Sequence, residues 1–227
     1  MSFIIAFGKY GVLREMKIQR RRIVTFLLFL LSSLSITGNV MATEEAKYAV
    51  LEKDGQFELR QYEPCIVAET LVEGDFDDVG NAGFRRLFRY ISGDNQAKIP
   101  ISMTSPVVQE MRSEKISMTA PVTQEKKGNY WSIAFVMPAE YAMDTLPIPT
   151  DAKVTLRAIP VRLVAVITYS GTWSESRYEE HKAMLDMMMS KRKLKTAGEY
   201  IYARYNPPFT PWFLRRNEVL VPVERIN

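Results

Sequence analysis

A ten-residue phrase occurs twice in this chain, and the repeat limits the architectures that the sequence allows. Residues 101–110 read ISMTSPVVQE and residues 116–125 read ISMTAPVTQE, so eight of the ten positions are identical at an offset of 15. Two copies of so short a unit cannot form the stacked units of a solenoid or a propeller. Apolar and polar residues alternate in each copy, and Pro106 and Pro121 interrupt both copies at the same place. This pattern predicts two neighbouring strands with an edge or a bulge at each proline.

Short strand patterns, separated by Gly and Pro, fill much of the chain after Thr43. Their β-branched and aromatic residues alternate with polar ones, which is typical of half-buried strands. The predicted strands are residues 48–55, 57–62, 65–74, 131–138, 154–160, 161–171, 199–205 and 218–223.

Two segments have helical periodicity instead. In residues 75–92 apolar side chains recur at helical spacing, carboxylates fill the first turn and Gly93 follows the last turn, as expected for an amphipathic helix. The second predicted helix runs from about residue 174 to residue 193. Ser176 and Glu179 have the spacing of a capping box near its start.

The two predicted helices divide the chain into halves with the same order of elements. Residues 65–74 lead into the first helix as residues 161–171 lead into the second, and a pair of strands follows each helix. We therefore expect an α+β fold, in which a distorted antiparallel β-barrel from two pseudo-symmetric halves is flanked by two α-helices. No change of composition separates the halves, so residues 43–227 are predicted to form a single domain.

The first 42 residues have the layout of a secretory signal peptide. From Met16 the sequence runs through a basic stretch, an apolar run and small polar residues to Val40 and Ala42, which occupy the small-residue positions before a cleavage site. We expect cleavage after Ala42 and a periplasmic or otherwise exported protein. The normal shape of a signal peptide begins at Met16, which is the expected true start of the chain.

An uncleaved membrane anchor is the alternative for the same segment. Residues 23–42 are 20 residues without a charged side chain, which is just long enough to span a bilayer. The second half of the stretch is polar, and this disfavours a span. Either interpretation leaves the domain beyond the membrane, with membrane contact only through the N-terminal segment.

The basic charge of the chain belongs mostly to this segment. The whole chain has 30 basic and 26 acidic side chains, of which six basic and one acidic lie in residues 1–42, so 24 basic and 25 acidic side chains remain. A nearly neutral domain lacks the basic footprint of a nucleic-acid-binding protein. No nucleic-acid partner is expected, and protein partners are left open.

Few residues are suited to catalysis or to metal binding. The chain contains one His, His181, and one Cys, Cys65, and it has no nucleophile-elbow or phosphate-loop motif. These counts exclude a His-rich metal site and a paired-Cys zinc or redox site. His181 falls near the apolar stripe of the second helix, where a packed side chain is favoured over a ligand. We therefore predict a protein that is not an enzyme.

One loop segment, ARYNPPFTPWFLRRNEV at residues 203–219, combines three prolines, the aromatic residues Phe209, Trp212 and Phe213, and two adjacent arginines. One interpretation is a rigid loop whose rings stack on a flat molecule while an arginine pairs with a carboxylate. The other is a plain strand connector in which an arginine pairs with Glu218. The residues themselves leave both interpretations open.

Two motifs resemble those of the SOUL haem-binding family. One is KISMTAPV at residues 115–122, with a looser copy at residues 98–107, and the other is YNPPFTP at residues 205–211 followed by RRNEV at residues 215–219. The similarity covers about residues 48–223. The resemblance implies a distorted antiparallel barrel with two flanking helices. It also implies non-covalent binding of haem or another tetrapyrrole as the ligand, without a defined catalytic activity.

The resemblance further implies a site between the first helix and the proline-rich loop, with apolar contacts to the tetrapyrrole and basic groups near its propionates. Asn81 and Thr210 stand where relatives can carry a basic residue, and Arg85 and Arg215 are the candidates to replace them. No axial ligand of the family maps onto His181 by motif. The corresponding apolar positions are Phe84, Phe88, Phe209 and Trp212.

We expect an exported, non-enzymatic tetrapyrrole-binding protein that acts as a carrier, buffer or sensor. The alternative is a binding module for another planar or amphipathic small ligand, because the two-half architecture is similar to the effector-binding domains of certain transcription regulators.

Overall fold

The computed structural model describes residues 43–98 and 113–226. Contacts divide the chain into two compact units, Met1–Ala42 and Thr43–Asn227, and the described elements all belong to the second unit. The predicted signal peptide and the first copy of the repeated phrase lie outside the described residues. No helix within residues 43–98 or 113–226 is long and apolar enough to cross a membrane.

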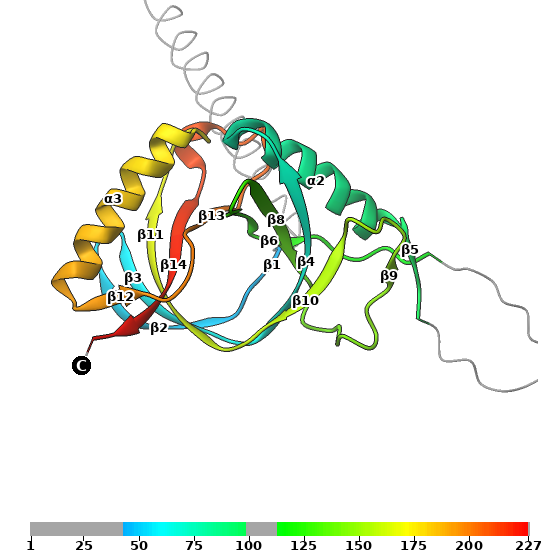
Figure 1. Cartoon of the computed structure of the whole chain (residues 1–227), viewed down its shortest axis with the longest axis horizontal. Coiled ribbons are helices and arrows are strands. Elements are labelled where there is room, and N and C mark those ends of the chain that lie inside the picture. Colours follow the sequence, from blue (N-terminus) through cyan, green and yellow to red (C-terminus); the bar gives the residue numbers. More distant parts are fainter. Residues whose placement is uncertain (1–42, 99–112, 227) are drawn as a thin grey trace, which may run out of the picture. The chain divides into compact units, whose positions relative to one another are not determined.

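One curled antiparallel sheet dominates the fold (Figure 1). Within the described residues, the two end strands of its path each pair along one edge, so the sheet forms a half-barrel, and the predicted α+β fold class is confirmed. The strands along the path are β10 (Thr155–Ile159), β4 (Cys65–Glu73), β8 (Tyr130–Val136), β7 (Val122–Lys127), β13 (Ile201–Arg204), β14 (Asn217–Arg225), β11 (Arg162–Tyr169), β3 (Phe57–Tyr62) and β2 (Tyr48–Asp54), with β12 (Leu194–Thr196) beside β14.

The expected two-half organisation is present in the strand order. The first half runs β10-β4-β8-β7 and the second runs in mirrored order from β13, so that β7 and β13 join the halves at the centre of the sheet. Gln124 of β7 lies opposite Tyr202 of β13 in this junction. Helix α2 (Phe76–Ser92) packs on β4 and β8, and helix α3 (Glu175–Lys191) packs on β11, β12 and β14.

The second copy of the repeated phrase forms two strands on either side of Pro121. These are β6 (Thr119–Ala120), which pairs in parallel with β1 (Glu44–Glu45), and β7. Both edges of β7 are occupied, by β8 and β13, so the prediction of two neighbouring strands from the two copies is wrong for β7. One edge of β7 pairs with its hairpin neighbour β8, and the other pairs with the distant β13. A further small pair joins β5 (Asn95–Gln96) to β9 (Ile148–Pro149).

Helix α2 approaches the sheet closely because two of its inward positions are glycines. Gly80 and Gly83 are both buried, three residues apart and therefore on one helical face. Gly93 ends the helix with φ of 125°, a conformation that favours glycine. The predicted extent of this helix is confirmed to within one residue at its start.

Helix α3 begins where the sequence predicts, but its predicted capping box is wrong. Ser174 is the N-cap residue and makes no side-chain cap hydrogen bond. Ser176 lies inside the first turn, where its hydroxyl pairs with that of Ser174 at 3.2 Å. Ser176 therefore cannot occupy the cap position that a capping box requires.

The main core fills the space between the two helices and the sheet. Phe76, Leu87, Ile133, Leu185 and Tyr202 are buried there together. Two smaller apolar clusters lie on the opposite face of the sheet, one around Val166 and Leu220 and one around Val67 and Ala134. The helix-bearing face therefore holds most of the buried apolar surface, and it also holds the pocket described next.

Candidate ligand-binding site

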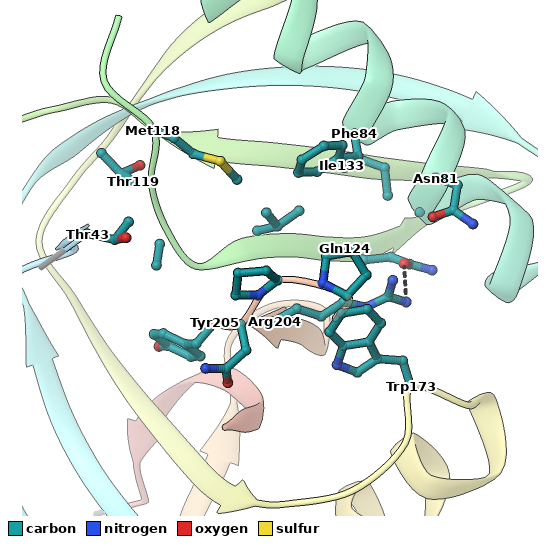
Figure 2. Close-up of a pocket in the computed structure, with 16 residues that line it drawn as sticks. Thr43, Asn81, Phe84, Met118, Thr119, Gln124, Ile133, Trp173, Arg204 and Tyr205 are labelled. Atoms are coloured by element: carbon teal, nitrogen blue, oxygen red, sulfur yellow. Dashed lines mark hydrogen bonds between the residues drawn. The ribbon is translucent and has the colours of Figure 1, made fainter. Parts of the chain in front are cut away.

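A pocket of about 260 Å³ opens on the helix-bearing face, at the junction of the two halves (Figure 2). Its walls come from α2, the second copy of the repeated phrase, β8, the end of β13, the turn before α3 and the start of the proline-rich loop. The side chains that matter below are Phe84, Met118, Gln124, Ile133, Trp173 and Arg204.

Strand alternation turns one face of the repeated phrase into the pocket wall. Met118, Ala120, Val122 and Gln124 are alternate residues and all line the pocket, as expected when side chains point to opposite faces of a strand. Gln124 also ties this wall to α2, since its Nε2 donates to the carbonyl of Phe76 at 3.0 Å.

The proline-rich loop forms the facing wall and is held rigid from within. Pro207 and Pro208 line the pocket. The guanidinium of Arg215 donates to the carbonyl of Thr210 at 2.7 Å and to that of Pro208 at 2.8 Å. The loop therefore keeps one shape without help from a ligand, and its prolines add to that stiffness.

A buried polar network fixes the two ends of this loop. Glu218, fully buried, accepts from Arg60 at 2.9 and 3.0 Å and from the hydroxyl of Tyr205 at 2.6 Å. Arg216 joins Glu218 at 2.9 Å and also reaches Glu45. The proposed pairing of a loop arginine with Glu218 is thus present, through Arg216.

The network also sets the protonation of its members. Burial alone would raise the pKa of Glu218, but hydrogen bonds and charges from Arg60 and Arg216 outweigh burial and hold that pKa below its usual value. Burial and the adjacent Glu218 carboxylate raise the pKa of Tyr205 well above its usual value. The Tyr205 phenol, which lines the pocket, therefore stays protonated and directed at Glu218.

Trp173 closes the pocket on the side of α3. Its Nε1 donates to Oδ1 of Asn217 at 2.8 Å, which fixes the ring. The guanidinium carbons of Arg215 and Arg204 lie 4.2 and 5.3 Å from the centre of the ring, within the range of cation–π attraction. Trp173 thus links the proline-rich loop to the last residue of β13.

Arg204 brings a positive charge to the pocket wall. Its Nη2 lies 3.4 Å from Oε1 of Gln124, a long hydrogen bond, and its buried Nε has no hydrogen-bond partner. Burial lowers the pKa of Arg204 below its ordinary value, although Tyr202 and Asp77 act in the opposite direction. An arginine remains charged at neutral pH even so.

Of the residues predicted on the first helix, Asn81 and Phe84 line the pocket. Phe88 lies one turn further along, stacked on Phe84 with ring centres 5.7 Å apart, and 46% of it is exposed. Arg85 is exposed and is not part of the pocket wall. The helix therefore presents a continuous strip of two rings that starts in the pocket and ends outside it.

The predicted residues on the loop lie outside the pocket wall, next to Pro207 and Pro208. Phe209 and Trp212 are exposed, by 85% and 60%. Thr210 and Arg215 are half-buried, and the Arg215 guanidinium is occupied by loop carbonyls. The role of these four residues toward a ligand stays a prediction.

His181 and Cys65 lie away from this pocket. The His181 ring is buried, stacks on Tyr169 at 3.7 Å between centres, and directs Nδ1 at the carbonyl of Arg177. Cys65 is half-buried on the opposite face of the sheet, at a small pocket of about 50 Å³. In the described part of the chain, no group of His, Cys, Asp or Glu side chains could hold a metal ion.

Sequence reasoning missed Met118, Gln124, Ile133, Trp173 and Arg204. A signal was available for the first two, because the alternation of the repeated phrase puts them on one face. No comparable signal marks Trp173 or Arg204. Arg204 reaches the pocket through the pairing of β13 with β7, and Trp173 reaches it from the turn between β11 and α3.

Comparisons with known proteins agree with this architecture. The sequence matches the family described as SOUL heme-binding protein over residues 43–222. It is 29% identical to heme-binding protein 1 of Xenopus laevis over 187 residues, which covers 82% of this chain and 93% of that protein. It is 27% identical to human heme-binding protein 2 over 173 residues, covering 72% and 80%.

Among solved structures, the C-terminal domain of EcmrR is similar in fold alone. The TM-score is 0.53 at 12% identity, and the match covers 75% of this chain and 98% of that domain. The matched family spans most of the sequence and includes both elements that form the pocket walls, α2 and the proline-rich loop. The chain therefore belongs to the SOUL heme-binding protein family.

Proposed function

We propose that this protein binds haem or another tetrapyrrole non-covalently in the pocket between α2 and the proline-rich loop. The observation that carries the proposal is the pocket itself, an apolar opening in a family of heme-binding proteins with two aromatic rings leading out of it. Phe84, Met118 and Ile133 would contact the flat face of the ligand, while Pro207 and Pro208 would contact its other side.

The size of the pocket supports partial rather than complete enclosure. Its volume of about 260 Å³ lies below the roughly 300 to 1,000 Å³ of pockets that enclose a drug-sized ligand. A tetrapyrrole is larger than that, so part of its plane would lie outside the pocket. The rings of Phe88, Phe209 and Trp212 are exposed, and we expect them to cover that part.

The cysteine content supports binding without covalent attachment. Attachment of haem through thioether bonds uses a C-x-x-C-H motif, and this chain has a single Cys with no such motif. The iron of a bound haem would supply redox or ligand-binding chemistry. The chain's own part is to provide apolar contact and to exclude water from one face.

A carrier, buffer or sensor role is favoured over catalysis. A tetrapyrrole-modifying enzyme needs a proton donor or acceptor at the reacting atoms. His181 does not line the pocket, and the Tyr205 hydroxyl is directed at Glu218. These positions support a binding role, with catalysis as the outcome that turnover of a bound tetrapyrrole would reveal.

The protein is further proposed to act outside the cytoplasm, after cleavage behind Ala42. The compact unit and the family match both begin at residue 43, and Glu45 is already tied into the fold through Arg216. N-terminal sequencing of the protein made in a bacterium with its own leader is expected to give Thr43 as the first residue. An intact N-terminus in the membrane fraction would support the anchor instead.

Titration of the purified protein with haemin and with metal-free protoporphyrin tests the binding proposal. Because contact is made through apolar area and not through an iron bond, both should bind with affinities within about tenfold of each other. A haemin spectrum with a strong low-spin band that disappears in His181→Ala, together with no binding of protoporphyrin, would contradict it and make His181 an axial ligand.

A further inference from the structure

Arg204 differs from the well-paired arginines of this fold. Arg60, Arg157 and Arg216 each lie 2.9 Å from a carboxylate oxygen. Arg204 makes no ion pair with any carboxylate in residues 43–98 or 113–226, and Asp77 acts on it only at longer range. Its charge is therefore left without a close counter-ion beside the pocket.

The fold makes room for this guanidinium at the pocket wall. A Cβ on Gly80 would come within 3.0 Å of Arg204 Nη1, so the absence of a side chain on α2 is what admits the group. Figure 2 shows Arg204 beside Trp173, with a dashed line to Gln124. Three different elements thus hold one cation against the cavity.

An unpaired charge that is largely removed from water is costly unless a partner of opposite sign is supplied. The contacts of Arg204 are two aromatic faces, one long hydrogen bond to an amide and a buried Nε with no partner. The nearby Tyr202 phenol also favours the charged guanidinium, but it does not outweigh burial, so compensation is incomplete. A carboxylate is the natural partner, because it accepts two hydrogen bonds from a guanidinium in one plane.

We propose that Arg204 binds a carboxylate of the ligand, so that this pocket selects amphipathic acids and takes them with one acidic group directed at β13. The apolar body of the acid then lies on Phe84, Met118 and Ile133. The inference rests on the proposed function for the identity of the ligand, since in a tetrapyrrole the acid is a propionate. It extends that function by assigning Arg204 as the group that binds the carboxylate.

The two arginines expected from sequence to meet an acid are less suited to this role. Arg215 already donates from its Nε and one Nη to loop carbonyls, and Arg85 does not line the pocket. The hydrogen bond of Arg204 to Gln124 is longer, at 3.4 Å, and leaves its Nη1 without a hydrogen-bond partner among the described residues. The cation that meets the acid therefore comes from the central strand junction and not from the surface of α2.

The ligand arm of the test uses the purified full-length chain without substitution. Protoporphyrin IX is compared with its dimethyl ester, which has the same ring and no charge. Pyrenebutyrate is compared with pyrenebutanol in the same way, as a non-porphyrin pair. Each acid should bind roughly 10- to 100-fold more tightly than its neutral partner, the range expected for hydrogen bonds to a charged group.

The variant arm uses Arg204→Gln and Arg204→Lys, with Arg162→Gln as the matched control. Arg162 also has a buried Nε without a hydrogen-bond partner, but it borders the small pocket on the other face of the sheet. Arg204→Gln should lose the preference for the acid, so that acid and ester bind with similar affinities. Arg204→Lys should recover part of the preference, and Arg162→Gln should retain all of it. Circular dichroism confirms that each variant is folded.

The two proposals fail in different ways. If pyrenebutyrate binds through Arg204 but no porphyrin binds, the acid site stands and the tetrapyrrole function is wrong. If porphyrins bind but acid and ester bind equally, or Arg204→Gln keeps the preference, the acid site is wrong and tetrapyrrole binding stands. If neither acid binds, both proposals are wrong.

Discussion

Gly83 of α2 lies so close to Ile133 of β8 that a Cβ on Gly83 would come within 2.4 Å of Ile133 Cγ1. Ile133 is fully buried and also lines the pocket, so it cannot move aside into solvent. This contact sets the distance between helix and sheet, and with it the width of the pocket beside Phe84.

The substitution Gly83→Ala should therefore destabilise the fold, although alanine is the better helix former by about 1 kcal/mol. Overpacking a dense core costs about 1 to 3 kcal/mol, and here it outweighs the gain in the helix. Urea unfolding of the variant measures the difference. In the double variant with Ile133→Gly the clash is removed, because this change takes away Ile133 Cβ at 2.6 Å as well as Cγ1 at 2.4 Å. The two costs should then be less than additive; full additivity would mean that the contact is not the cause.

Glu218→Gln should cost up to about 3 to 5 kcal/mol at neutral pH, the range for breaking a buried ion pair, because the buried Arg60 then keeps only Glu58, 2.7 Å away, as a counter-charge. Glu179→Gln is the matched control, since Glu179 forms an exposed pair with Lys182 and such pairs contribute about 0 to 1 kcal/mol. Urea unfolding at pH 7 compares the two variants with the native protein.

The same network makes the stability of the fold dependent on pH in the acidic range. The folded pKa of Glu218 is lowered from 4.5, so its contribution is present above that pH and is lost as the pH falls through the folded pKa. The difference in the free energy of unfolding between the native protein and Glu218→Gln should therefore become smaller as the pH is lowered from 5 to 3. A difference that stays constant over this range would show that the Glu218 carboxylate does not titrate as described.

Glu125 behaves in the opposite way. Burial raises its pKa above 4.5, and the nearby cations of Lys127 and Arg157 only partly offset this. A raised pKa means that its contribution to stability is present below the unfolded pKa and is lost as the pH rises. Glu125→Gln should therefore raise the melting temperature at pH 7 but not at pH 4, while Glu73→Gln at the exposed end of β4 should change neither. A lower melting temperature for Glu125→Gln at pH 7 would rule out this account.

Phe88→Ala tests whether a bound tetrapyrrole extends beyond the pocket. If the ligand lies on the strip formed by Phe84 and Phe88, loss of one ring should weaken protoporphyrin binding by about 1 to 3 kcal/mol. Met187→Ala is the control, because Met187 is 53% exposed at a comparable place on α3. Equal affinities for Phe88→Ala and the native protein would confine the ligand to the pocket.

The helices and the order of the two halves could be predicted because they rest on local patterns. Apolar spacing and Gly93 define α2, and alternation defines most strands. The pairing of β7 with β13 could not be predicted in this way. Strand pairing between distant segments is decided by the packing of the whole sheet, so β13 took one edge of β7, the hairpin neighbour β8 took the other, and neither edge pairs with the copy that was expected there.

The residues of the candidate site also fall into two groups, those that local sequence patterns predict and those that depend on the assembled fold. Asn81 and Phe84 follow from the family motif and the helical face of α2. Arg204 does not, because the sequence shows only an arginine at the end of a strand. Its lack of a carboxylate partner is a property of the assembled fold, in which Gly80 makes space for the guanidinium and no acidic side chain of the described residues reaches it.

The most direct test of tetrapyrrole binding in this pocket is methyl NMR of protein labelled at methionine and isoleucine, titrated with metal-free protoporphyrin. A porphyrin ring shifts the resonances of methyl groups that it covers. The methyls of Met118 and Ile133, which line the pocket, should shift strongly and saturably, while that of Met187 on α3 should not move. Binding with large shifts at Met187 and none at Met118 or Ile133 would contradict the assignment of the pocket as the tetrapyrrole site.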